Sequence, residues 1–134
     1  MTPDLAFAVA SAVHVGFQLT VTAVVYPALA TRRADEWPRA HDRHRRTIAP
    51  VVLLVYGALL ATGGWLIASG PGGLELVAVG VTALAFSTTA FGAAPIHGRL
   101  TQRDTTLVRR LFVVDRVRCA FAVAAGVLAV LAIS

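Results

Sequence analysis

The positive charges of this chain are all arginines, and they are confined to two short blocks. Twelve of the 134 residues are Lys or Arg, all twelve are Arg, and they fall within residues 32–46 and 99–118. Residues 5–31, 47–74 and 76–98 contain no Asp, Glu, Lys or Arg. A polytopic membrane protein concentrates its basic residues in cytoplasmic loops between uncharged spans. The charge pattern therefore predicts an integral membrane protein.

Each of the three uncharged stretches supplies the roughly 20 apolar residues that a membrane-spanning helix needs. A fourth stretch, residues 119–134, has only 16 residues, which at about 1.5 Å per residue reach roughly 24 Å across a core of about 30 Å. To span the membrane it must draw Asp115, Arg116 and Arg118 into the membrane boundary. With 57% hydrophobic residues, the chain has room for one four-helix unit. We expect an all-α, integral membrane four-helix bundle that forms a single domain over residues 1–134.

The topology follows from the even number of spans and from the position of the arginines. The short segments around Asp4 and Glu75 carry no basic residue, so we expect both termini outside and two basic loops in the cytoplasm. The localisation we expect is the inner (plasma) membrane, as a multi-pass protein surrounded by the lipid bilayer. No nucleic acid is expected as a partner, because the arginines flank spans and no aromatic residues are interleaved with them. The only cysteine, Cys119, lies within a span, which excludes an intrachain disulfide.

Small residues recur at helical spacing on three of the spans, and such stripes let membrane helices approach closely. We expect these stripes to face the bundle interior, although a composition rich in Ala and Gly also produces them by chance. A Gly-rich turn at residues 69–73 joins the second and third spans. The stripes are Gly57, Ala61, Gly64 and Ala68; Ala83, Ser87, Ala90 and Ala94; and Ala122, Ala125, Gly126 and Ala129.

A polar stripe runs along the first span, within about one third of the helix circumference at about 100° per residue. Polar groups at membrane depth must face the protein interior or a wet cavity, so the stripe predicts an internal pocket or a set of interhelical hydrogen bonds. A bis-histidine haem site is not expected, because His14 is the only histidine near the middle of a span. The stripe consists of Ser11, His14, Gln18, Thr22 and Tyr26.

The start of the fourth span carries two opposite charges on the face that continues into its small residues. Asp115 and Arg118 are three positions apart, a spacing that allows them to pair and lowers the cost of placing both at the membrane boundary. Two interpretations stay open. Either the pair fixes the position of the helix, or Arg118 positions an anionic or phenolate oxygen while Asp115 accepts a proton or binds a metal.

Three of the four histidines, His41, His44 and His97, lie at the cytoplasmic end, close in depth to Asp115. Imidazoles combined with a carboxylate suit Fe, Cu or Zn. Candidate metal ligands are therefore His44, His97 and Asp115, with a single Fe or Cu as the candidate cofactor. The arginines around His41 and His44 disfavour a divalent cation and fit instead an interfacial helix that contacts lipid phosphate, so a protein without a cofactor is the other expectation.

Three short motifs resemble those of the anthrone oxygenase-like family of small four-span membrane proteins. Residues 25–29 (VYPAL) resemble its apolar-Pro-Ala-Leu end of the first helix, and residues 94–100 (APIHGRL) its Pro-Leu-Asn-x-x-Leu motif after the third. Residues 114–119 (VDRVRC) are similar to its Trp-Asn-x-x-Arg-Thr motif at the start of the fourth. His97 and Asp115 stand where the family has asparagines, and Cys119 where it has a threonine.

The resemblance implies an oxidative enzyme, because fungal members of the family oxidise polyketide anthrones to anthraquinones with dioxygen; most bacterial members have no assigned function. It implies a flat, lipophilic, phenolic small molecule as substrate. In this mechanism Arg118 holds a phenolate, and His97 or Asp115, titratable where the family has asparagine, removes a proton or binds a metal. The candidate catalytic residues are Tyr26, His97, Asp115 and Arg118, and the candidate substrate-binding residues are His14, Gln18 and Arg118.

Other classes of function stay open. In a non-catalytic membrane protein, a partner subunit or a small-molecule binding module, the same polar residues would only hold helices together. A proton-coupled exporter is disfavoured, because no carboxylate lies at the middle of a span. Four thin helices enclose a cavity more readily with a second copy, so a homo-oligomer is a further expectation.

Overall fold

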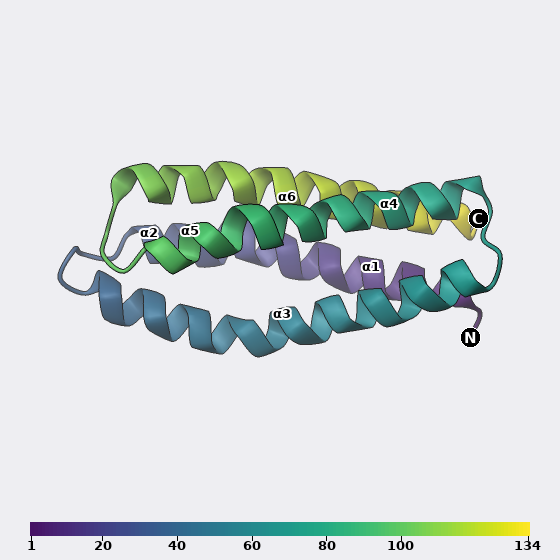
Figure 1. Ribbon diagram of the computed structural model, residues 1–134, viewed down its shortest axis with the longest axis horizontal. Coiled ribbons are helices and arrows are strands. Elements are labelled where there is room, and N and C mark those ends of the chain that lie inside the picture. The colour runs from purple at the N-terminus through teal and green to yellow at the C-terminus, as the bar shows by residue number, and fades with distance from the viewer.

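The computed structural model describes residues 1–134, and all of its regular structure is helical. Four long helices lie side by side along the long axis of the molecule (Figure 1). The predicted all-α architecture of four helices is confirmed. In chain order the elements are α1 (Pro3–Thr20), η1 (Val21–Val25), α2 (Tyr26–Ala30), α3 (Trp37–Ala68), α4 (Gly73–Ser87), η2 (Thr88–Ala93), α5 (Ala94–Arg99) and α6 (Thr105–Ala132).

Three of the long helices are long and apolar enough to cross a membrane, namely Pro3–Ala30, Trp37–Ala68 and Gly73–Arg99. These helices indicate a membrane protein. The fourth, α6, is not among them, because Asp115, Arg116 and Arg118 adjoin its short apolar half. Its role as a fourth span stays a prediction.

The ends of the bundle differ in character. The two connections next to the arginine blocks, residues 31–36 and 100–104, lie at one end, and both termini lie at the other with the turn between α3 and α4 (Figure 1). Gly70 in that turn has a φ of 74°, a conformation that favours glycine. At the basic end, the Asp104 carboxylate accepts hydrogen bonds from the backbone N–H groups of Thr106 and Leu107 and so caps α6.

Two prolines widen the long helices locally. Pro27 and Pro95 have no backbone N–H, and a proline ring clashes with the carbonyl four residues earlier in a regular helix. The turn before each of these two prolines is π-helical (η1 and η2), whereas α3 stays α-helical around Pro50, and the chain continues through each π-helical turn as one helix. π-bulges of this kind occur frequently at functional sites. In each case the N–H just before the proline donates to the carbonyl five residues back: Tyr26 to Val21, and Ala94 to Thr89.

The expected small-residue stripe is confirmed in α6, where it is fully buried. The closest approach is to α1, since a Cβ added at Gly126 would stand 2.6 Å from the Val15 side chain. Only a small residue permits this separation of the two helices. The buried members are Ala122, Ala125, Gly126 and Ala129.

The expectation for the stripes of the second and third spans is wrong, because all eight of their residues are exposed. No atom lies within 4 Å of a Cβ added at Gly57 or Gly64. The α3 helix instead packs on α1 through larger residues, and the Phe7 ring fills the space over Gly63, 3.4 Å from an added Cβ. Helical spacing thus identified a face of each helix but not the face that meets its neighbours. The buried faces are Val55, Leu59, Gly63 and Leu66 in α3, and Ala78, Thr82 and Ala85 in α4.

The interior consists of two apolar clusters with polar residues between them. One cluster, around Phe7 and Leu59, lies toward the termini, and the other, around Leu100 and Leu111, lies toward the basic end. Helix α1 packs on α3 and α6, and α4 packs on α6. The layer between the clusters holds most of the buried polar side chains of the bundle.

Candidate functional site

A buried ion pair lies on α6 at the level of the polar layer. Arg118 Nη2 donates to Asp115 Oδ1 over 2.7 Å, and the two side chains are 6% and 1% exposed. From α1, Gln18 Nε2 donates to the same oxygen over 2.8 Å. The pairing expected from the i, i+3 spacing is confirmed, and Gln18 joins it to the first helix.

Several polar atoms of this layer have no hydrogen-bond partner in the protein. Nearly all buried polar groups in proteins are paired, because an unpaired one costs about 1–3 kcal/mol. The free atoms lie on the facing sides of α1 and α6, so this interior can satisfy the polar groups of a ligand or of water. They are Ser11 Oγ, His14 Nε2, Gln18 Oε1, Asp115 Oδ2 and Arg118 Nε.

A chain of hydrogen bonds leads from Tyr26 toward the basic end of the bundle. Tyr26 Oη lies 3.0 Å from His97 Nε2, and His97 Nδ1 lies 3.0 Å from His41 Nε2. The His41 ring stacks on Trp37, the first residue of α3. If Tyr26 donates to His97, then His97 donates to His41, and each neutral ring needs only one N–H. Such a chain can pass a proton by exchange of tautomers.

A cavity of about 110 Å³ lies between the first long helix, α3 and the η2–α5 segment. Its polar lining comes from four different parts of the chain, and the rest of the lining is apolar or aromatic. The volume is smaller than the cavity of about 150 Å³ that holds benzene in an apolar core. It therefore admits one edge of a ring, or a diatomic gas. The polar lining residues are Tyr26, His44, Thr89, His97 and Arg118.

The two π-helical segments help to form this cavity. Val21 of η1 and Thr89 and Ala93 of η2 all line it. Tyr26 follows η1 directly and His97 lies one helical turn, four positions, after the end of η2, so the widened turns set the direction of both side chains. The prolines at positions 27 and 95 thus act on the site without lining it.

A second, wider groove of about 470 Å³ lies beside the cavity, between the start of α3 and α5. Its outer lining is charged and includes Arg45 and Arg46. The cavity and the groove share four lining residues, His44, Ile48, Ala94 and His97. These four side chains therefore separate the inner cavity from the groove.

The structure brings together three of the four candidate catalytic residues and sets the fourth behind them. Tyr26, His97 and Arg118 line the cavity, whereas Asp115 contacts Arg118 and Gln18 and does not line it. The candidate binding residues His14 and Gln18 do not line it either. Each is buried at the polar layer beside it.

The candidate metal ligands His44, His97 and Asp115 are not assembled into a metal site. No group of three or more His, Cys, Asp or Glu side chains has an arrangement that could hold a metal ion. Both ring nitrogens of His97 already have partners, and Asp115 Oδ1 accepts from Arg118 and Gln18. The ring centroids of His44 and His97 are 5.8 Å apart.

Tyr56 and Thr89 also belong to this region but were not predicted from the sequence. Tyr56 Oη lies 2.6 Å from Thr89 Oγ1, and its ring meets His14 edge to face with centroids 5.4 Å apart. The available signal was composition, since Tyr56 is one of only two tyrosines and lies inside an apolar span. A second signal was the proline two positions after each π-helical segment.

Comparisons of this chain with protein-family models, with curated proteins and with solved structures give no match. The likeness to the anthrone oxygenase-like family therefore rests on its three motifs alone. Function has to be argued from the geometry of the site.

Proposed function

We propose that this protein is a membrane oxidoreductase that binds a lipophilic phenolic substrate between Tyr26, His97 and Arg118 and oxidises it with dioxygen. One observation carries the proposal: Arg118, a buried residue fixed by Asp115, lines a largely apolar cavity together with a hydrogen-bonded Tyr26–His97 pair. A cation held in a dry site stabilises a phenolate oxygen far more than water does. The motif resemblance supports the same substrate class.

In the membrane, both termini of the protein lie outside, the two basic connections lie in the cytoplasm, and α6 is a fourth span. The protein belongs to the plasma membrane. The cavity then opens toward the cytoplasmic leaflet, from which a lipophilic substrate can enter sideways.

The substrate enters with its phenolic edge first. The inner cavity of about 110 Å³ takes that edge, and the remaining rings lie in the groove of about 470 Å³. For this to happen, His44 and Ile48 of α3 must move away from Ala94 and His97 of α5. Replacing Ile48 by Ala should ease entry, and replacing it by Trp should block it.

The reaction converts a methylene group between aromatic rings into a ketone. Arg118 stabilises the phenolate of the substrate. The Tyr26 hydroxyl gives up its hydrogen bond to His97 Nε2, and Nε2 then takes one C–H proton from the methylene carbon. The resulting carbanion gives its electrons to dioxygen, forms a C–O bond, and recovers the proton as a hydroperoxide. Loss of water then breaks the O–O bond and removes the second C–H hydrogen, so that CH₂ and O₂ become C=O and H₂O. Dioxygen is the only oxidant.

The proton path runs away from the lipid. When His97 accepts a proton at Nε2, its Nδ1–H can pass a proton to His41, which lies toward the basic end. Tyr26 orients His97 through its hydroxyl. No metal ion takes part in this scheme.

The experiment is oxygen uptake by the detergent-purified protein with dihydroxyanthrone as substrate, corrected for the rate without protein. Arg118→Gln should lower the enzymatic rate about 10²–10³-fold, the usual loss when one donor to an oxyanion is removed. Arg116→Gln is the matched control, because Arg116 is exposed two positions away on the same helix. Equal rates in the two variants would refute the proposed site.

A second pair of variants tests the histidine chain. Tyr26→Phe removes the hydroxyl that contacts His97, and Tyr56→Phe removes a hydroxyl that contacts Thr89. Each loses one hydrogen bond, at a cost of about 0.5–1.5 kcal/mol in stability. Only Tyr26→Phe should slow oxygen uptake.

A non-catalytic binding module is the second candidate, and one observation favours it. The contact of Gln18 with Asp115 joins α1 to α6, and Arg118 neutralises Asp115, so the polar layer stabilises the bundle whether or not it acts on a substrate. Such a protein would bind dihydroxyanthrone without consuming oxygen. Its variants at Arg118 would change binding and thermal stability together.

A further inference from the structure

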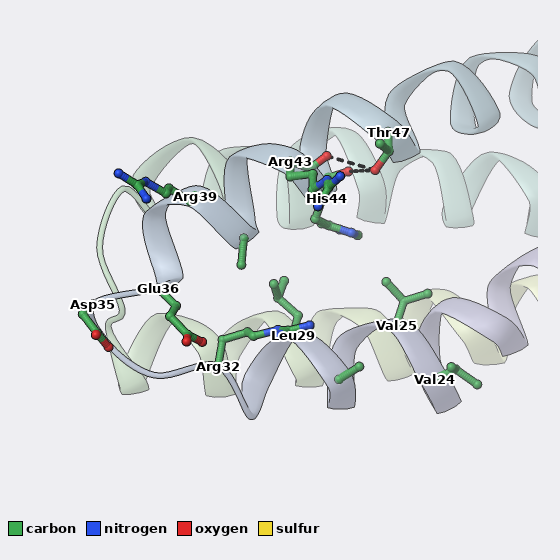
Figure 2. A pocket seen from close by; sticks show the side chains of 12 residues that line it. Val24, Val25, Leu29, Arg32, Asp35, Glu36, Arg39, Arg43, His44 and Thr47 are labelled. Atoms are coloured by element: carbon green, nitrogen blue, oxygen red, sulfur yellow. Dashed lines mark hydrogen bonds between the residues drawn. The ribbon is translucent and has the colours of Figure 1, made fainter.

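A wide groove adjoins the candidate site at the basic end of the bundle, between α2 and α3. It measures about 810 Å³. Figure 2 shows the last turns of the first long helix forming one wall and the first turns of α3 forming the other. Of its lining residues, only His44 also lines the inner cavity. The groove is therefore a separate feature from the cavity at Arg118.

The groove has an apolar part and a cationic part. Val24, Val25 and Leu29 line it on the first long helix, and the side chain of Arg32 extends along the same wall beside Leu29 (Figure 2). Val24 is 60% exposed although it is a large apolar residue. The cationic residues lie at the end of the groove nearest the connection between α2 and α3. The apolar residues lie at the end toward the bilayer interior.

The arginines of the groove have no partners within the protein. The only salt bridges of the chain are Arg33 with Asp35, Arg46 with Asp42, and Arg118 with Asp115. Arg32, Arg39 and Arg43 line the groove and belong to none of them. Of the two acidic residues in the lining, Asp35 is already neutralised by Arg33. Three free guanidinium groups thus face one free carboxylate, that of Glu36.

We propose that the groove between α2 and α3 binds an anionic phospholipid. Guanidinium groups pair with phosphate through two parallel hydrogen bonds, which favours Arg32 and Arg43, one from each wall, as headgroup contacts. Val24 is eight positions before Arg32 and so lies deeper toward the bilayer interior. That depth suits the upper part of an acyl chain below its phosphate. The inference does not depend on the proposed oxidation.

The groove differs from the general basic character of the loops. Basic residues beside spans are attracted to anionic lipid surfaces wherever they lie. Arg99 and Arg110, in the other arginine block, are equally exposed but do not line this groove. A specific site requires that charge and apolar wall act together, and this can be tested by removing each in turn.

The test is native mass spectrometry of the full chain in detergent, with palmitoyl-oleoyl phosphatidylglycerol and the phosphatidylcholine of the same acyl chains as probes. The wild-type chain should retain one phosphatidylglycerol in clear preference to phosphatidylcholine. Arg32→Gln with Arg43→Gln should weaken that binding roughly thirtyfold, through loss of two arginine–phosphate contacts. Arg99→Gln with Arg110→Gln, which removes the same charge elsewhere, should leave it unchanged.

A third variant tests the apolar wall. Ala28 is exposed and lines the groove, so Ala28→Trp fills the acyl part without removing any charge or disturbing the core. It should also lose the lipid. Retention of phosphatidylglycerol by Ala28→Trp, equal losses in the two double arginine variants, equal retention of both lipids, or a second copy of the chain in place of the lipid would each overturn the proposal.

Discussion

Asp115 is the residue on which the polar interior depends most, because its Oδ1 accepts hydrogen bonds from both Arg118 and Gln18. Removing one partner of a buried ion pair leaves an uncompensated charge and costs about 3–5 kcal/mol. Asp115→Ala should therefore lower the unfolding free energy in detergent by about that amount.

The double variant Asp115→Ala with Arg118→Ala is the control. Since it removes both charges, it should be less destabilised than the sum of the two single variants, which a thermal or denaturant unfolding series measures. Additive losses would mean that the two side chains do not depend on each other.

At the scale of residues, the polar face of the first helix could be predicted from its period, because period and depth require these side chains to face inward. The structure buries Ser11, His14, Gln18 and Tyr26. Their partners could not be predicted, since the contact of Gln18 with Asp115 joins positions 97 residues apart. The expected metal ligands are not assembled into a site for a related reason. The sequence places His97 and Asp115 at one depth, but it does not show that other side chains already form hydrogen bonds with both.

At the scale of helices, Gly126 determines how closely α6 approaches α1. An added Cβ would meet the Val15 side chain at 2.6 Å. Gly126→Ala should destabilise the bundle by about 1–3 kcal/mol, the usual range for overpacking. The measurement is the midpoint of thermal unfolding in detergent.

Gly64→Ala is the matched control, because an added Cβ there meets no atom within 4 Å. Alanine is the better helix former, so this variant should be neutral or more stable by up to about 1 kcal/mol. Destabilisation at Gly64 equal to that at Gly126 would show that the small residues of α3 also face a neighbour.

Pro95 produces the π-helical segment that precedes His97. Pro95→Ala restores the missing N–H, which allows η2 to become regular α-helix and rotates the residues after it relative to those before. Circular dichroism should show unchanged helix content, while oxygen uptake with dihydroxyanthrone falls at least about tenfold because His97 no longer meets Tyr26. Full activity in this variant would mean that the bulge does not position the site.

The bounds of the first and third long helices were predicted well, since residues 5–31 and 76–98 correspond to Pro3–Ala30 and Gly73–Arg99. The other two long helices, α3 and α6, begin ten or more residues before the predicted stretches, at Trp37 and Thr105, and so include charge runs that were assigned to loops. Helix faces were predicted less well. The faces of α3 and α4 were assigned from small residues, and both assignments were wrong. Large residues such as Leu59 and Phe7 fill the space between α1 and α3, a property of helix spacing that one helix alone does not reveal.

At the scale of the whole molecule, the arrangement of four helices with both termini at one end agrees with the charge pattern (Figure 1). Which side of the membrane each end faces is a prediction that labelling can test. In a Cys119→Ala background, a membrane-impermeant maleimide applied to intact cells should label Ser134→Cys fully and Thr101→Cys only after permeabilisation. Labelling of Thr101→Cys alone would reverse the topology, and labelling of both would show that α6 does not span.

The central claim is that Arg118 and its cavity form a binding site for a phenolic molecule, and binding of dihydroxyanthraquinone tests it most directly. The measurement is equilibrium binding of dihydroxyanthraquinone to the purified protein, detected by the change in ligand absorbance between its phenol and phenolate forms. It is made on the wild-type chain, Arg118→Gln and Arg116→Gln. We predict phenolate-type binding in the wild-type chain and in Arg116→Gln, and loss of it in Arg118→Gln. Equal binding in all three, or a bound ligand that stays a neutral phenol, would contradict the claim.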